Sequence, residues 1–569
     1  MIAKVPLKTS FIELRARDRA AAILDTGTFQ EILGPFDRLE SPHLAPQNIV
    51  PQSDDGVVVA QGLIDGESAV VIAIEGAFQG GGIGEVSGAK FAGALELALR
   101  DNEHGRRTRP VLLFDTGGVR LQEANYGLLA IAEIGSAMVA LRRYVPVVGV
   151  IPGMVGCFGG MSITAGLCST LIMTREGRLG LNGPEVIEQE AGIGEFDASD
   201  RQLIWNTVGG AQRHATGFAD VLVEDDVTVV TGAVQDAFRR GVPAEHRSAQ
   251  VDRYLSRLAG IDLKHLDGPM LRERWGKERG EEPEELLKSP DGQGGQTGEK
   301  GPVSRGRVWL EALCGGSQLP MTGSSSVLCT DSTLGDERVR YISVVPDPDN
   351  RFPRARQGEV GLNEGWTLAR VVRDAVDEDV DGERRAIVAI VDVPSQAYGY
   401  REELLGIHQA CAAAVDAYAT ARLAGHPVVA LIVGNAISGA FLAHGLQANR
   451  ILALDAPGVQ VQVMSKKSAA TVTRRSIAEL EEIAKKVPGA AYDIRSFASL
   501  GAVHGLMGGI DADAPGDKEI QRILNALSDA IAAARSGPRD LSNRLTSVEA
   551  RTGRSASILV RERMTEQWN

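Results

Sequence analysis

Cysteine and aromatic residues are scarce in this chain. Only five of its 569 residues are cysteines, and no two of them form a Cys-x-x-Cys pair. This excludes a disulfide framework and the usual zinc-binding spacing, and it favours reduced thiols. Aromatic residues make up 5% of the chain, whereas glycine occurs 66 times. We therefore expect close packing of helices on sheets and no metal site.

The chain also lacks an excess of positive charge and any long apolar run. It has 60 lysines and arginines but 74 aspartates and glutamates, which gives a net charge of −14. This negative charge argues against nucleic-acid binding. No apolar run reaches the length of a membrane span, and Met1–Asp18 has no apolar core typical of a signal peptide. We expect a cytoplasmic protein that binds neither nucleic acid nor membranes.

The length of the chain predicts several domains. Residues 276–307 are charged, glycine-rich and poor in apolar side chains, a composition typical of a flexible linker. We predict a first domain over residues 1–275, this linker, and a second domain over residues 308–535. Residues 536–569 are polar and are predicted to form a C-terminal tail or a capping helix.

The most informative stretch is Pro146–Gly166. An apolar run at its start predicts a buried strand, a Pro-Gly break follows, and small residues after Gly159 and Gly160 predict a helix. Glycine lets the backbone approach a ligand closely, and the first turn of a helix has free N–H groups. Together they can form an oxyanion hole without a charged side chain.

The same order of features recurs in Pro427–Gly445. Upstream of the two copies, Pro110–Ile131 and Ala386–Gln409 also match each other as strand, turn and helix. Two matched pairs in the same order predict two copies of one α/β fold in a single chain.

Other interpretations compete for single residues of these motifs. Ser438 lies in a turn like a nucleophile elbow and could form a hydrolase triad with Asp455 and His504. The glycine-rich Gly80–Gly88 could be a dinucleotide loop, but Ser87 replaces its third glycine. Six other residues near the motifs are expected to have structural roles. We expect Cys157 to be a small buried residue, His408 and His444 to pack on helices, Asp115 and Asp392 to cap turns at strand ends, and Glu185 to lie in the first turn of a helix.

The motifs resemble the carboxyltransferase branch of the crotonase superfamily. FDTGGVRLQEANYGLLAIAEI (114–134), GCFGGMSITAG (156–166) and LGLNGPEVIE (179–188) are similar to its β-type half. DVPSQAYGYREELLGIHQA (392–410) and GNAISGAFLAHG (434–445) are similar to its α-type half. The malonate decarboxylases are the more similar members, as if their β and γ subunits were fused. The resemblance covers roughly residues 10–265 and 308–535.

The resemblance implies two crotonase-like (ββα-spiral) α/β domains that form an intramolecular pseudo-dimer. It also implies decarboxylation of a malonyl thioester through an enolate held by backbone N–H groups. In the first half the candidate donors are Gly118, Val119, Gly159 and Gly160; in the second they are Gln396, Ala397, Gly439 and Ala440. Ser438, Gln396, Tyr398 or a water is each a candidate to return the proton.

The implied partners are an acyl carrier protein with a CoA-like arm and a transferase subunit that loads malonate, and a higher oligomer is compatible with this. No covalently bound cofactor is expected. Lys466, Lys467, Arg474 and Arg475 form a basic cluster that could dock the carrier or its phosphates, or could be a solvated helix face.

The chain departs from biotin-dependent relatives in two ways. Residues 1–60 contain no cysteine of a zinc ribbon, and no Met-Lys-Met biotin attachment site occurs. Two alternatives stay open: a biotin-dependent acyl-CoA carboxyltransferase subunit, and a scaffold that only docks the carrier protein.

Overall fold

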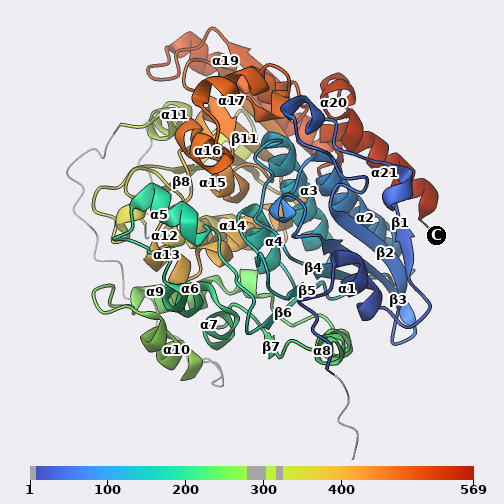
Figure 1. Cartoon of the computed structure of the whole chain (residues 1–569). Helices are drawn as coiled ribbons and strands as arrows, with labels where there is room; N and C mark the ends of the chain where they lie inside the picture. The colour runs from blue at the N-terminus through green and yellow to red at the C-terminus, as the bar shows by residue number, and fades with distance from the viewer. Residues whose placement is uncertain (1–7, 278–302, 316–323, 569) are drawn as a thin grey trace, which may run out of the picture.

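The structure is a computed structural model that describes residues 8–277, 303–315 and 324–568 (Figure 1). It contains two mixed sheets, one in each half of the chain. Most of the predicted linker lies outside the described residues. At its two ends, Gly276 and Lys277 complete helix α10, and α11 begins at Arg305. None of the helices within the described residues has the length and apolar composition needed to cross a bilayer.

The first sheet has the strand order β1-β2-β3-β4-β5-β6-β7; β1 to β3 are antiparallel and the others parallel. Its strands are β1 (Gln30–Ile32), β2 (Val57–Ile64), β3 (Glu67–Ile74), β4 (Arg109–Leu113), β5 (Val148–Ile151), β6 (Thr170–Thr174) and β7 (Val221–Val223). Its helices are α1 (Ala16–Ile23), α2 (Glu85–Glu103), α3 (Asn125–Leu141), α4 (Gly160–Gly166), α5 (Pro184–Ala191), α6 (Arg201–Val208), α7 (Gly210–Ala215), α8 (Val227–Arg240), α9 (Val251–Ala259) and α10 (Gly268–Lys277).

The second sheet repeats this plan. Its order is β14-β12-β11-β10-β9-β8, with β13 paired to the end of β11. Its strands are β8 (Val327–Leu334), β9 (Glu337–Val344), β10 (Ala386–Val393), β11 (Val428–Ile437), β12 (Arg450–Asp455), β13 (Gln460–Gln462) and β14 (Gly505–Gly508). Its helices are α11 (Arg305–Leu313), α12 (Leu362–Glu378), α13 (Tyr400–Leu404), α14 (Ile407–Ala424), α15 (Ser438–Ala443), α16 (Lys466–Thr473), α17 (Ile477–Ala484), α18 (Ile494–Ala498), α19 (Asp517–Ser536), α20 (Val548–Gly553) and α21 (Ser555–Gln567).

Each sheet contains a β-hairpin, β2–β3 or β8–β9, that is followed by parallel strands. Asp65 and Gly66, in the turn of the first hairpin, both have a positive φ, the conformation that a two-residue hairpin loop requires. Apolar β-branched residues fill the parallel strands because helices cover both faces of such a sheet. The predicted duplication of one α/β fold is confirmed.

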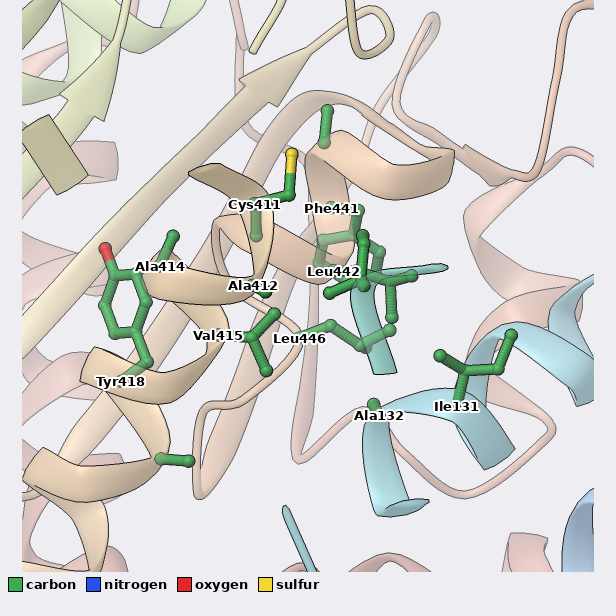
Figure 2. Close-up of a cluster of buried hydrophobic side chains, with 14 of the residues drawn as sticks. Ile131, Ala132, Cys411, Ala412, Ala414, Val415, Tyr418, Phe441, Leu442 and Leu446 are labelled. Atoms are coloured by element: carbon green, nitrogen blue, oxygen red, sulfur yellow. The ribbon is translucent and has the colours of Figure 1, made fainter. Parts of the chain in front are cut away.

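The two halves pack through helices that carry small and aliphatic residues. Helix α14 contacts α3 and α4, and α15 contacts α4. Ile131 of the first half and Val415, Leu442 and Leu446 of the second belong to one buried apolar cluster (Figure 2). One core therefore continues across both halves, as a pseudo-dimer requires.

The C-terminal segment lies against the first half, beside α2 (Figure 1). Arg554 and Arg561 form ion pairs of 2.6 and 2.9 Å with the buried Glu133 of α3. Burial alone would raise the pKa of Glu133, but the two guanidinium groups lower it to about 2. Residues 548–567 are thus a helical cap on the other half of the molecule and not an extended tail.

Candidate active site

A cleft of about 490 Å³ lies between the two halves. It is lined from both sides by the glycine-rich turns, by the loop before α5 and by the end of α16. The main lining residues of the first half are Val119, Arg120, Phe158, Gly159, Gly160, Arg178, Leu181, Asn182 and Glu185; those of the second are Gln396, Tyr398, Ser438, Met464, Val472 and Thr473. The cleft therefore brings together both predicted motifs of each half.

In the first half two backbone N–H groups remain available at this cleft. Among the described residues, no acceptor pairs with the N–H of Val119 or of Gly160, the first residue of α4. The other two predicted donors are already bonded: Gly118 N donates to Thr116 Oγ1 at 3.0 Å, and Gly159 N donates to Leu181 O at 3.0 Å. The two predicted donors of this half that remain unbonded at the cleft are thus Val119 and Gly160.

Two glycines with positive φ make this arrangement sterically feasible. Gly118 (φ 107°) and Gly159 (φ 57°) lie against each other, so that a Cβ on Gly118 would be only 2.9 Å from the Cα of Gly159. A Cβ on Gly159 would lie 3.8 Å from the nitrogen of Val119. Any side chain at either position would push the two donor turns apart or cover a donor.

The turn in the second half matches the first one bond for bond. In each half, a residue shortly before a long helix forms two backbone hydrogen bonds with the residues on either side of a predicted donor. This residue is Ile83, before α2, for the donor Val119, and Val360, before α12, for Gln396. The bonds are Ile83 N to Gly118 O (2.8 Å), Arg120 N to Ile83 O (2.9 Å), Val360 N to Ser395 O (3.0 Å) and Ala397 N to Val360 O (3.0 Å). Gln396 therefore occupies the position of Val119. Because the N–H of Ala397 is used in one of these bonds, Ala397 cannot donate to a ligand.

The second donor turn differs from the first in one respect. Ser438 has φ 56°, like Gly159, which places Gly439 in the position of Gly160. The N–H of Gly439 donates to Oε1 of the Gln396 side chain at 3.1 Å. Ala440, also predicted here, is fully buried and does not line the cleft. The N–H that corresponds to Gly160 is therefore already bonded to a side chain of the protein itself, whereas the backbone N–H of Gln396 has no acceptor among the described residues.

Asn182 and Glu403 are functional candidates that the sequence did not reveal. Gln396 Nε2 donates to Asn182 Oδ1 at 2.9 Å, and Asn182 Nδ2 donates to Ala397 O at 3.0 Å. Glu403 of α13 accepts from the N–H groups of Leu181 and Asn182 at 3.1 and 2.6 Å. Burial raises the pKa of Glu403 to about 7. These bonds cross from one half to the other, which no local sequence pattern can indicate.

The two arginines that line the cleft are engaged elsewhere. Arg120 forms ion pairs of 2.6 Å with Asp55 and Glu123, all three buried. Burial raises the pKa of Asp55 to about 6, against the opposing effect of Arg120. Arg178 donates to the backbone carbonyls of Met154 and Val155 at 2.8 and 3.1 Å. Apart from Arg120, Arg178 and Glu185, the residues that line the cleft are neutral.

The hydrolase triad is not assembled. Asp455 accepts from Arg495 Nε at 2.9 Å. The backbone of His504 bonds to Ile451, which lies four residues before Asp455 along β12, or about 13 Å at the usual rise of a strand. Ser438 therefore has no catalytic base and acid from this set.

The other polar residues singled out in the sequence have structural surroundings. His444 bonds to the hydroxyl of Tyr418 and to Ile390 O, both at 3.0 Å. His408 packs edge-on against Phe218, and burial lowers its pKa well below the usual value. Burial raises the pKa of the Cys157 thiol. Asp115 accepts from the N–H of Val155, after β5, and Asp392 accepts from the N–H of Asn435, near the end of β11, so both carboxylates hold the backbone of the neighbouring strand's end.

The predicted basic cluster lies on and beside α16, next to the cleft. Lys466 pairs with Glu481 at 3.0 Å, and Arg475 donates to Gln47 at 2.8 Å. Lys467 and Arg474 are exposed, and no ion pair or hydrogen bond of either side chain is found among the described residues. Arg474 ends the helix in a left-handed conformation (φ 54°). The four residues therefore do not share one helix face, but two of them are available to an anionic partner.

The chain matches two known families in sequence. Residues 355–568 match the family described as malonate decarboxylase gamma subunit, and residues 13–251 match the carboxyl transferase domain. The division between the two matches follows the two halves of the fold.

Curated relatives and solved structures show the same similarity. A malonyl-S-ACP:biotin-protein carboxyltransferase of Malonomonas rubra, MADC, is 41% identical over 298 residues, covering 49% of this chain and 92% of the relative. A second one, MADD, is 40% identical over 194 residues, covering 33% of this chain and 66% of the relative. A crystal structure of a Pseudomonas malonate decarboxylase hetero-tetramer with malonate is 58% identical, covering 48% of this chain and 99% of that one, with a TM-score of 0.47.

Proposed function

Because this chain belongs to the malonate decarboxylase family of carboxyltransferases, we propose that it decarboxylates a malonyl thioester to an acetyl thioester and CO₂. It would act as a carboxy-lyase on malonate carried by an acyl carrier protein. The observation that supports this proposal best is the pair of unoccupied N–H groups of Val119 and Gly160 in a cleft built by both halves.

Loss of CO₂ breaks the bond between the α-carbon and the carboxylate, and the electron pair moves toward the thioester oxygen. Two donors at that oxygen stabilise the enolate more than the neutral carbonyl, because the charge develops there. Such donors typically contribute a factor of about 10²–10³ each in kcat. The N–H groups of Val119 and Gly160 would therefore act on the thioester oxygen.

The enolate then takes up a proton at the α-carbon. Ser438 and Tyr398 both line the cleft and belong to the second half, whereas Val119 and Gly160 belong to the first. Burial, with a contribution from Glu190, raises the pKa of Tyr398, which keeps this side chain protonated. Either hydroxyl, or a water held by them, could deliver the proton, whereas the amide of Gln396 is too weak an acid.

We further propose that the substrate arrives on the CoA-like arm of an acyl carrier protein loaded by a separate transferase subunit. The exposed Lys467 and Arg474 beside the cleft would bind the acidic carrier or its phosphates. A cytoplasmic location is consistent with five buried, unpaired cysteines.

A second candidate function is transfer of the carboxyl group to a biotin protein. The Malonomonas relatives are named for that activity. In this case the same cleft would produce the same enolate, but CO₂ would leave only after transfer to biotin.

One experiment separates the two candidates. Purified protein is incubated with malonyl-CoA in biotin-free buffer containing avidin, and acetyl-CoA and CO₂ are measured. Direct decarboxylation predicts equal amounts of both products, unaffected by avidin. If acetyl-CoA appears only when avidin is omitted and a biotinylated carrier protein is added, with one carboxybiotin formed for each acetyl-CoA, the chain is a carboxyltransferase. Absence of product under both conditions would contradict both proposals.

A further inference from the structure

Gln396 occupies an unusual position for a polar side chain. It stands where the first half has Val119, and its own carboxamide accepts from the N–H of Gly439 beside it. Its side chain is buried, yet it lines the cleft. The two halves therefore present different groups to one ligand: two unbonded backbone N–H groups in the first half, and one unbonded backbone N–H beside a side-chain amide in the second.

The orientation of this amide is fixed by its neighbours. The N–H of Gly439 requires an acceptor, so that the atom 3.1 Å away is the oxygen Oε1. Nε2 then faces Asn182 Oδ1, at 2.9 Å. Asn182 is itself oriented, because its Nδ2 donates to Ala397 O at 3.0 Å. The three hydrogen bonds of the Gln396 and Asn182 side-chain amides agree with one assignment of their oxygen and nitrogen atoms.

An amide nitrogen carries two hydrogens, and Asn182 takes only one of them. The second N–H of Gln396 has no acceptor among the described residues. We propose that this N–H binds the free carboxylate of the malonyl thioester, so that Gln396 selects malonyl over acetyl thioesters. This inference rests on the proposed function of the cleft and adds the residue that recognises the group to be lost.

A neutral donor suits this step better than a cation. The carboxylate must lose its charge as CO₂, so a lysine or arginine beside it would stabilise the ground state more than the transition state. Arg120 is neutralised by Asp55 and Glu123, and Arg178 is bonded to backbone carbonyls. One amide N–H can hold the carboxylate out of the thioester plane without opposing its departure.

The test compares two variants of the full chain on two ligands. Gln396→Met keeps the length of the side chain and removes the amide. Gln396→Glu keeps an acceptor for Gly439 but adds a negative charge. Steady-state kinetics give the KM for malonyl-CoA and the inhibition constant of acetyl-CoA, and thermal melting confirms folding. Equilibrium dialysis with radiolabelled malonyl-CoA provides the same comparison without turnover.

Acetyl-CoA lacks the carboxylate and is the internal control. In Gln396→Met the KM for malonyl-CoA should rise about tenfold or more, the size of one hydrogen bond to a charged group. The rise should be larger in Gln396→Glu. Inhibition by acetyl-CoA should be unchanged in both folded variants.

Two results would overturn the inference: an unchanged KM for malonyl-CoA in Gln396→Met, or an equal loss of affinity for both ligands. If the wild-type protein makes no acetyl-CoA but binds malonyl-CoA more tightly than either variant does, the proposed reaction fails while the recognition by Gln396 stands. The two failures are therefore distinguishable.

Discussion

Gly159 is a residue whose conformation and position both exclude a side chain. Its φ of 57° and ψ of −149° lie in a region that is essentially restricted to glycine. A Cβ there would lie 3.0 Å from Gly118 Cα and 3.8 Å from Val119 N. By contrast, a Cβ on Gly160 would meet Leu442 and Ile131 of the interface at 2.9 and 3.0 Å. Substitution of Gly159 therefore tests the oxyanion position, and substitution of Gly160 tests the packing of the halves.

We expect Gly159→Ala to lower kcat for malonyl thioester about 10²–10³-fold, the usual cost of losing one oxyanion donor. The measurement is steady-state decarboxylation, with circular dichroism to confirm folding. Gly241→Ala is a matched control, because Gly241 also has a positive φ (77°) but no atom lies within 4 Å of its Cβ position. Normal turnover in a folded Gly159→Ala protein would remove this position from the mechanism.

Glu402 is a buried residue whose carboxyl group makes the stability of the fold depend on pH. Neither carboxyl oxygen has a partner among the described residues, and burial raises its pKa to about 7. The unfolded chain ionises this group near pH 4.5, so folding stability is lost as the pH rises from about 4.5 to about 7. We expect Glu402→Leu to stabilise the protein, and the gain to be up to roughly 3 kcal/mol larger at pH 8 than at pH 4.5. Urea unfolding at both pH values measures this. An equal gain at both pH values would show that the pKa of Glu402 is not raised.

The glycines of the donor turns could be predicted from the sequence, but not which of the N–H groups there are already hydrogen-bonded. Gly159 and Gly160 were identified because small residues follow a strand. Gly159 N bonds to the carbonyl of Leu181, and the Gln396 side chain bonds to Gly439 while Asn182 of the other half orients its amide. Such long-range pairs leave no periodic signal in a single sequence.

At the scale of elements, strands and helices followed from apolar periodicity and turn residues. The strand predicted at the start of Pro146–Gly166 is β5 (Val148–Ile151), and Glu185, expected in a first helical turn, lies in the first turn of α5. Lys467 and Arg474 of the basic cluster do not lie on one helix face. Arg474 adopts a left-handed conformation after Thr473, where the helix ends, and the sequence around it carries no glycine to mark that end.

Helix α16 is the element on which carrier binding can be tested. Charge reversal by Lys467→Glu with Arg474→Glu should raise the KM for malonyl carrier protein and leave kcat nearly unchanged, because only uniform binding is lost. The effect should disappear near 1 M salt, where the Debye length is about 3 Å. Lys518→Glu with Arg551→Glu, at exposed positions in other helices, is the control for net charge. An unchanged KM at low salt would assign the cluster to the solvated surface.

At the scale of the whole molecule, the internal repeat predicted two similar halves facing each other. It could not predict that α20 and α21 lie on the first half. The charges that hold them, Arg554 and Arg561 with Glu133, are more than 400 residues apart in the chain. Nothing in a polar C-terminal sequence identifies such partners.

We expect the two halves to remain together when the connection between them is cut. A protease site placed between residues 278 and 302 should yield two fragments that elute together in gel filtration and retain most of the activity. The reasons are the continuous apolar core and buried pairs across the interface, such as Arg142 with Asp416. Fragments that separate readily, each fully active, would contradict a site shared by both halves.

The proposed reaction depends most directly on polarisation of the thioester carbonyl by the N–H groups of Val119 and Gly160. Infrared difference spectroscopy with acetyl-CoA labelled by ¹³C at the carbonyl measures this directly. The account predicts that the labelled carbonyl stretch of the bound ligand shifts to lower frequency than in water, and that the shift is lost in Gly159→Ala. A bound ligand whose carbonyl frequency in the wild-type protein equals that in water would contradict it.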